Sequence, residues 1–262
     1  MNKVTLGDGK EIYCISRFEA QMLDLHISEY LKNDIVINDN DTVIDIGANI
    51  GIFGHRVSQK SKSEIFAFEP VQDIYEVLEK NAKLSNNKKY KTFSYGISDK
   101  NEVIDFVYYP NCPAMSTSNP EMWDDRQQLL TAIKGSLQFA PKEWWWAKLI
   151  PVPFYSVISY WMRRNPKYIK CKLKTLSYVI EKKTIHKIDL LKIDCEGNEL
   201  KVLEGIDDKD WPIIKQIVLE THNINDRLKK IINKLERYGF TLKVVKEQSL
   251  KETELFNIYA KR

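Results

Sequence analysis

The sequence has no long apolar run and only four cysteines, and both absences limit what the protein can be. Its longest uncharged, mostly apolar stretch, residues 149–162, has 14 residues and two prolines, which is too short and too broken for a transmembrane helix. The cysteines show no CxxC pair and no histidines at ligand spacing, so we do not expect a zinc site. The N-terminus lacks the apolar core of a secretory signal, so we expect a cytoplasmic protein with reduced thiols.

Excess charge of either sign is also missing. The net charge is +4 over 262 residues, which is too small to indicate nucleic acid as the main partner. No RNA-binding domain accompanies the rest of the chain, which argues against an enzyme that acts on RNA. The composition, 43% hydrophobic and 29% charged, is that of one globular domain able to bury a large core.

The part of the chain with the clearest pattern alternates strands with helices. Strands apolar on both faces and separated by helices predict a parallel α/β sheet covered on both sides. A hairpin at 3–16 and a helix at 17–31 precede the alternation, and an antiparallel pair at 241–247 and 255–262 closes it. The remaining predicted strands are 42–48, 64–70, 90–98, 103–109, 188–194 and 216–222, and the predicted helices are 50–60, 74–85, 198–206 and 223–239.

One segment interrupts the alternation. Residues 110–175 hold five of the six tryptophans and several prolines, and we interpret them as an insertion between strands. We therefore predict a single domain over 1–262, with residues 1–35 as an N-terminal hairpin and helix and 110–175 as a lid or substrate-binding segment.

A glycine-rich turn follows the first strand of the alternation. In VIDIGANIGIF (43–53), Asp45 lies near the strand end, and Gly47 and Gly51 follow at GxxxG spacing. Glycine lets the chain turn sharply beside a ligand, and ligands bind at the carboxyl ends of such strands. The dinucleotide fingerprint GxGxxG is absent, which favours a nucleoside without phosphates.

An acid at the end of the second strand supports this interpretation. Glu69 follows Gly51 by 18 residues, and an acid there can accept hydrogen bonds from both hydroxyls of a ribose. A nucleoside cofactor that is not a phosphate ester, bound over DxGxxxG, indicates S-adenosylmethionine.

Four stretches carry a resemblance to a known family. VIDIGANIG (43–51), FEP (68–70), GISD (96–99) and LLKIDCEGNELKVLEG (190–205) are similar to the FkbM-type S-adenosylmethionine-dependent methyltransferases. The resemblance covers about residues 36–109 and 174–262, and the insertion matches no pattern. It implies the Rossmann-like class I methyltransferase fold, with seven strands in a mostly parallel sheet. It also implies O-methylation, usually of a sugar hydroxyl or of a hydroxyl on a secondary metabolite.

The resemblance also implies roles for particular residues. Glu69 would hold the ribose, and Asp99 would lie near the adenine unless it only serves the turn SDKNE (98–102). The methionine end of the cofactor would be lined by Asp45, Gly47, Asn49 and Gly51.

Catalytic candidates gather after the next two strands. Asp194 and Glu196, two residues apart in LKIDCEGNE, would share a face of an extended chain, at the edge where chemistry collects. His222 ends the following strand, and any of the three could remove the proton from an attacking hydroxyl. The three could also bind a divalent ion, but the spacing of a dedicated ligand cluster is absent, so we predict no metal site. Glu199 has a simpler alternative in stabilising the start of a helix.

The aromatic segment 141–174 leaves three alternatives open. It could be a lid that stacks on a sugar or base, with its basic residues pairing to a nucleotide diphosphate. It could be a peripheral membrane contact, apolar and then basic, or a homo-oligomer interface or extra core. We favour the first, and hence methylation of a sugar hydroxyl on a nucleotide-sugar or polysaccharide precursor. Methylation of a small secondary metabolite and a non-catalytic S-adenosylmethionine-binding module are the alternatives.

Overall fold

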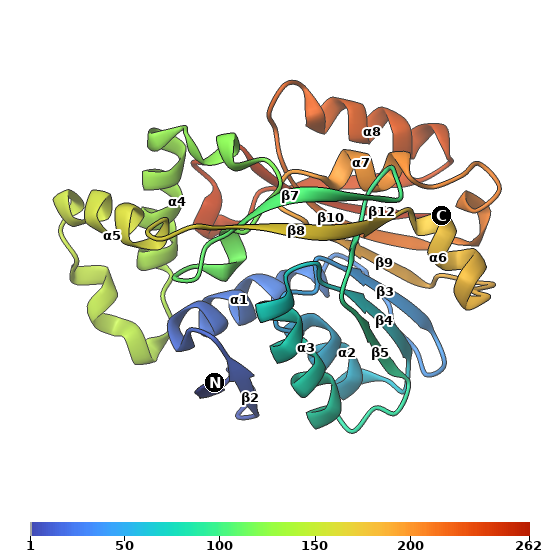
Figure 1. Ribbon diagram of the computed structural model, residues 1–262, viewed down its shortest axis with the longest axis horizontal. Coiled ribbons are helices and arrows are strands. Elements are labelled where there is room, and N and C mark those ends of the chain that lie inside the picture. The colour runs from blue at the N-terminus through green and yellow to red at the C-terminus, as the bar shows by residue number, and fades with distance from the viewer. Residues whose placement is uncertain (1) are drawn as a thin grey trace.

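The computed structural model describes residues 2–262 and is built around the predicted seven-stranded sheet (Figure 1). Its order is β11-β12-β10-β9-β3-β4-β5. The five strands from β10 to β5 run parallel, and β12 is antiparallel to both of its neighbours. The strands are β3 (Thr42–Ile46), β4 (Glu64–Phe68), β5 (Tyr90–Phe93), β9 (Leu190–Ile193), β10 (Gln216–His222), β11 (Thr241–Val245) and β12 (Leu255–Lys261).

Two layers of helices cover this sheet because its central strands are apolar on both faces. On β3, Val43 belongs to the core beneath α1, α2 and α3, whereas Ile44 and Ile46 belong to the core beneath α6, α7 and α8. The two layers are visible below and above the sheet in Figure 1. The first comprises α1 (Arg17–Tyr30), α2 (Ile52–Lys60) and α3 (Gln72–Leu84), and the second α6 (Leu176–Lys183), α7 (Glu199–Glu204) and α8 (Arg227–Arg237).

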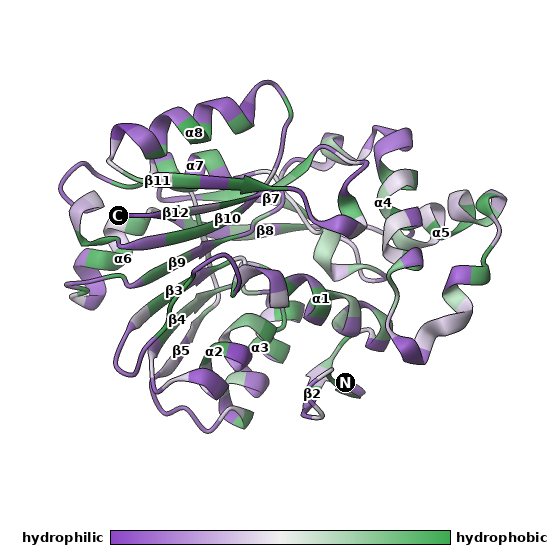
Figure 2. Cartoon of the chain, turned by 180° about the vertical axis from the view of Figure 1, so that it is seen from behind, coloured by the Kyte–Doolittle hydropathy of each residue, from purple (hydrophilic) through white to green (hydrophobic). Residues whose placement is uncertain are grey.

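Helix α8 illustrates how the pattern of residues fixes an outer helix. Ile231 and Leu235, four residues apart, are fully buried against the sheet, while Lys229, Lys230 and Arg237 are exposed. Figure 2 shows the resulting bands of green and purple along α8. The helix begins at Arg227, four residues later than the predicted start at 223.

The last residues of the predicted insertion form part of a small second sheet. Residues Lys167–Lys174 form strand β8, which pairs antiparallel with β7 (Glu102–Tyr108) and parallel with β6 (Gly96–Ile97). Cys171 and Leu173 are buried, whereas Lys170 and Lys172, which alternate with them, are exposed. The basic run is therefore the solvent face of a strand.

The rest of the insertion forms a third core with the N-terminal helix. Leu129, Ile133 and Tyr155 pack there with Met22 of α1. The predicted hairpin is present as β1 (Asn2–Thr5) and β2 (Glu11–Cys14). Within residues 2–262, no helix is long and apolar enough to cross a membrane. The helices of the insertion are η1 (Pro113–Met115), η2 (Pro120–Trp123), α4 (Arg126–Gln138), η3 (Lys142–Leu149), η4 (Val152–Phe154) and α5 (Tyr155–Met162), and the later short turns are η5 (Trp211–Ile213) and η6 (Gln248–Leu250).

Candidate active site

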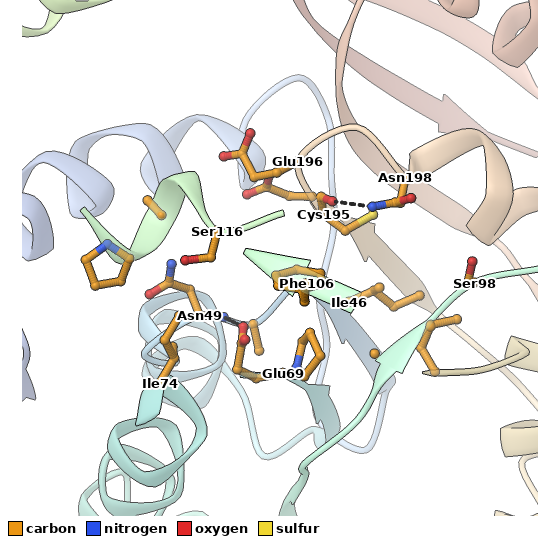
Figure 3. Close-up of a pocket in the computed structure, with 18 of the residues that line it drawn as sticks. Ile46, Asn49, Glu69, Ile74, Ser98, Phe106, Ser116, Cys195, Glu196 and Asn198 are labelled. Carbon is orange, nitrogen blue, oxygen red and sulfur yellow. Dashed lines mark hydrogen bonds between the residues drawn. The ribbon is translucent and has the colours of Figure 1, made fainter. Parts of the chain in front are cut away.

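A cavity opens at the carboxyl ends of β3, β4 and β9, where an open α/β sheet is expected to bind ligands. Its empty space is about 850 Å³, counting the open mouth. Figure 3 shows Glu69 and Asn49 on one side of it, Glu196 and Asn198 on the other, and Phe106 between them. Of the predicted site residues, the cavity is lined by Gly47, Asn49, Glu69, Asp194 and Glu196.

The β3–α2 turn is held against the loop after β9. Gly47 has a φ of +70°, and a Cβ on it would lie 1.7 Å from the backbone oxygen of Asp194. Only glycine fits this approach. Gly51, with a φ of +86°, is the N-cap of α2 and does not line the cavity.

Glu69 is fixed at the end of β4 with its carboxylate at the cavity wall. Its Oε2 accepts a hydrogen bond from the backbone N–H of Asn49 at 3.1 Å, and its Oε1 accepts one from Val71 at 2.9 Å. Burial raises the pKa of Glu69 to about 7, against the opposing effect of these two bonds. Each carboxylate oxygen keeps a free lone pair for a ligand hydroxyl.

Asp45 lies behind the cavity wall and forms an ion pair with Lys192, a residue that the sequence did not single out. Asp45 is fully buried, and its Oδ1 lies 3.1 Å from Nζ of Lys192 on β9. Lys192, itself buried, also donates to the backbone oxygen of Gly47 at 2.7 Å. Burial lowers the pKa of Lys192, but the carboxylates of Asp45 and Asp194 more than offset this and raise it. Lys192 thus joins β3 and β9 at their carboxyl ends.

Asp194 is held by two neighbours. Its Oδ2 accepts a hydrogen bond from the Tyr30 hydroxyl at 3.1 Å and lies 3.7 Å from Nζ of Lys192. Tyr30 ends helix α1 and is buried, so the N-terminal helix contributes to the site. The sequence predicts the helix at 17–31 but not this contact.

Glu196 and His222, two of the candidate bases, lie close together and form a pair. Glu196 Oε2 lies 3.8 Å from Nε2 of His222. Glu196 adopts a left-handed φ of +48°, and its backbone oxygen accepts a bond from the Thr117 hydroxyl at 2.7 Å. Burial raises the pKa of the Glu196 carboxyl, and His222 opposes this shift.

Glu199 points away from the cavity. It is buried, and its Oε1 accepts a hydrogen bond from the backbone N–H of Gly197 at 2.8 Å. Its Oε2 lies 3.6 Å from Nη1 of Arg227. This carboxylate therefore ties the loop before α7 to helix α8, in line with its predicted structural alternative.

The far wall of the cavity is apolar. Ile74, Ile97 and Phe106 line it together with Ser98. Asp99 does not line it, and its Oδ1 accepts a hydrogen bond from the Ser98 hydroxyl at 3.0 Å. Three residues of the stretch GISD, Gly96, Ile97 and Ser98, therefore reach the cavity, and the fourth, Asp99, does not.

A second cavity lies on the other side of His222. His222 and Trp123 line it, with their rings edge to face and 5.7 Å between centroids. The insertion supplies residues 119–132 to its wall, and the loops after β10 and β11 supply the rest. The Glu196–His222 pair therefore lies between the two cavities.

The tryptophan-rich part of the insertion lies away from both cavities. Trp144 packs edge to face on Phe18 of α1, and Trp145, Trp146 and Trp161 are exposed. The insertion reaches the first cavity through Pro113, Ala114 and Ser116 and through Leu173 of β8. Within residues 2–262, no group of three His, Cys, Asp or Glu side chains is arranged to hold a metal ion.

Comparison with known proteins places the chain in a family. The family model described as "Methyltransferase FkbM domain" matches residues 45–242. The 31-O-demethyl-FK506 methyltransferase FkbM of Streptomyces tacrolimicus is 28% identical over 98% of this chain and 95% of its own length. Methyltransferase sdnD of Sordaria araneosa is 29% identical over 90% of this chain and 88% of its own length.

Two further similarities cover only part of the related protein. AMB antimetabolite synthetase AmbE of Pseudomonas aeruginosa is 30% identical over 99% of this chain, which spans 12% of that protein. The crystal structure of Methyltransferase FkbM from Methylobacillus flagellatus has a TM-score of 0.50 at 11% identity, covering 94% of this chain and 55% of that one. The latter similarity concerns the fold alone.

Proposed function

Because the chain belongs to the FkbM methyltransferase family, we propose that it transfers the methyl group of S-adenosylmethionine to a hydroxyl oxygen of an uncharged small molecule. The observation that carries this proposal is the Glu196–His222 pair, whose Oε2 and Nε2 atoms lie 3.8 Å apart. The pair lies between the two cavities. A hydroxyl is a poor acid, so its methylation needs a base at this position.

The residues of the first cavity fit the cofactor that the family and the fold imply. Glu69 offers carboxylate lone pairs for the ribose hydroxyls, and Gly47 and Asn49 would face the methionine end. Ile97 and Phe106 give an apolar wall for the adenine, with Ser98 beside them. The acids after β9 would attract the positive sulfonium, which supplies an electrophilic methyl group to the reaction.

His222 is the base that this arrangement supports best. Its Nε2 faces Glu196, and its ring also lines the second cavity, where the acceptor would bind. The hydroxyl proton would pass to the imidazole of His222 as the oxygen bonds to the methyl carbon, and the electrons of the broken carbon–sulfur bond would return to sulfur. Glu196 would orient the imidazole and stabilise the positive charge that it gains. Asp194, already bonded by Tyr30, would act on the cofactor side.

The charges of the second cavity support an uncharged acceptor rather than a nucleotide-sugar. Glu121, Asp125 and Glu254 line it, and its one arginine, Arg227, is already paired with Glu199. The basic strand β8 contributes nothing to its wall. Phosphates would therefore meet negative charge. The name of the Streptomyces relative indicates an oxygen of FK506 that lacks its methyl group, which also favours a hydroxyl on a natural product.

The substitution Glu69→Gln is expected to weaken S-adenosylmethionine binding by about 10–100-fold, because hydrogen bonds to a charged acceptor contribute about 1.5–3 kcal/mol. Since burial raises the pKa of Glu69 to about 7, wild-type affinity should rise as the pH increases from about 6 to about 8. Isothermal titration at several pH values measures both effects. Glu64→Gln, at the opposite end of β4, should bind normally.

In the ligand-free protein, the contribution of Glu69 to the free energy of unfolding should fall as the pH increases, whereas cofactor affinity rises. The pKa of Glu69 is higher in the folded than in the unfolded state, so its contribution is present below the unfolded value near 4.5 and is lost as pH rises through about 7. A Glu69→Gln variant that kept the wild-type pH dependence of binding would remove Glu69 from the cofactor site.

The acceptor class can be tested with one pyranose in two forms. We expect the methyl glycoside to be methylated with a kcat/KM about tenfold higher than that of the nucleoside diphosphate derivative, because negative charge around the cavity repels the diphosphate. The double variant Glu121→Gln/Glu254→Gln should narrow this difference. A preference for the nucleotide form would overturn the uncharged class while leaving the methyltransferase activity in place.

A further inference from the structure

Helix α5 and the turns before it carry large apolar side chains on the outside of the protein. Isolated exposed apolar residues are ordinary, but a contiguous group marks an interaction surface. We call the following six side chains the α5 surface. They are Trp145 (64% exposed), Leu149 (68%), Val152 (68%), Phe154 (56%), Val157 (60%) and Tyr160 (67%).

Helix α5 is apolar on two faces, and only one of them has a partner in the described chain. Tyr155, Ile158 and Met162 recur at helical spacing and pack into the core of the insertion. Val157 and Tyr160 lie on the other face and point to solvent. The core of the protein therefore does not explain why the outer face is apolar.

The charges around this surface are positive. Lys142, Lys148 and Arg164 are exposed, and none of them forms an ion pair with any residue in 2–262. Glu143 is the one acid between residues 139 and 166. Apolar and aromatic side chains beside unpaired cations are typical of segments that lie in the interface of an anionic membrane.

We propose that the α5 surface docks on an anionic lipid bilayer, with its apolar side chains in the headgroup region and the three cations on the lipid charges. Tyrosine and tryptophan favour this depth of the bilayer. A second copy of the chain fits the surface less well. A two-fold interface would place the same surface against itself and bring the unpaired cations of both copies together.

The position of the surface agrees with docking of the working enzyme. Helix α5 lies at the end of the molecule opposite the C-terminus in both views (Figures 1 and 2). None of the six side chains lines the cavity of Figure 3 or the second cavity beside His222. Docking therefore leaves the two cavities free of the bilayer.

Co-sedimentation with vesicles tests the proposal. The wild-type chain should pellet with vesicles of phosphatidylcholine and phosphatidylglycerol and bind pure phosphatidylcholine about tenfold more weakly. The variant Leu149→Ser/Val152→Ser/Phe154→Ser should lose about tenfold or more of its affinity. A matched control is Val103→Ser/Tyr168→Ser, which removes side chains that are 57% and 79% exposed on the second sheet; it should bind like the wild type.

Three other results would contradict the proposal, and one further variant supports it if it behaves as expected. Failure of the wild type to bind the anionic vesicles would overturn the proposal, as would equal binding to neutral vesicles. Concentration-dependent dimers in sedimentation velocity that disappear in the triple serine variant, without vesicle binding, would assign the surface to a second copy instead. The charge reversal Lys142→Glu/Lys148→Glu should weaken binding to anionic vesicles and leave methyl transfer in solution unchanged.

Discussion

Replacing Lys192 by methionine is expected to lower the free energy of unfolding by about 3–5 kcal/mol, because the change leaves a buried carboxylate without its counter-charge. Lys192 Nζ lies 3.1 Å from Oδ1 of Asp45, which is fully buried. The same ammonium bonds the backbone oxygen of Gly47. Methionine nearly matches the volume of lysine, so the lost interactions and not a cavity account for the loss. Urea denaturation at pH 7 measures the effect.

A second substitution separates charge from packing. In Lys192→Met/Asp45→Asn the uncompensated carboxylate is gone, so at least half of the lost stability should return. The loss in the single variant should also grow as pH rises from about 4 to about 7, since burial raises the pKa of Asp45 and folding then opposes its ionisation. A single variant that loses less than about 1 kcal/mol would show that the pair is not a structural requirement.

Replacing His222 by alanine is expected to lower kcat by about 10²–10⁴-fold, the usual contribution of a positioned general base. Its Nε2 lies 3.8 Å from Glu196 Oε2, and its ring lines the second cavity but not the first. S-Adenosylmethionine binding should therefore be unchanged. Formation of S-adenosylhomocysteine with a saturating acceptor alcohol measures kcat, and isothermal titration measures cofactor affinity.

The pairing of His222 with Glu196 leads to a more specific prediction for kcat. If the two act as a unit, Glu196→Gln should also lower kcat, and the double variant should be little worse than His222→Ala alone. His186 is exposed, so His186→Asn serves as the control and should keep full activity. If the losses in kcat of the two single variants multiply in the double variant, His222 and Glu196 act independently. If kcat is unchanged in His222→Ala, the general base is Glu196 or Asp194 instead.

The sequence predicted the sheet well because its signals are local. Apolar strands and helical periods are readable along the chain, and glycine at position 47 reflects a turn that leaves no room for a Cβ. The end of a parallel strand also locates Glu69 and Asp194, since the carboxyl ends meet at one edge.

The residues that sequence reasoning missed depend on contacts between distant segments. Lys192 reads as an ordinary lysine because its strand is buried on both faces and no alternation marks its direction. Tyr30 reaches Asp194 across 164 positions of the sequence. Strand β8 alternates lysines with Cys171 and Leu173, but no partner strand is evident from the sequence, so the lysines taken alone suggest a site for phosphates.

The close approach of the β3–α2 turn to the end of β9 also has a consequence for folding. The hydrogen bond from Lys192 to Gly47 spans 145 positions of the chain, and the second sheet and the whole insertion lie between its ends. Closing so long a loop is entropically unfavourable, and pairings of this kind slow folding. Strands β3 and β4 can associate early, but β9 must dock before the first cavity has both of its walls. Cofactor affinity therefore arises late in folding, and bound cofactor stabilises the junction that is formed last.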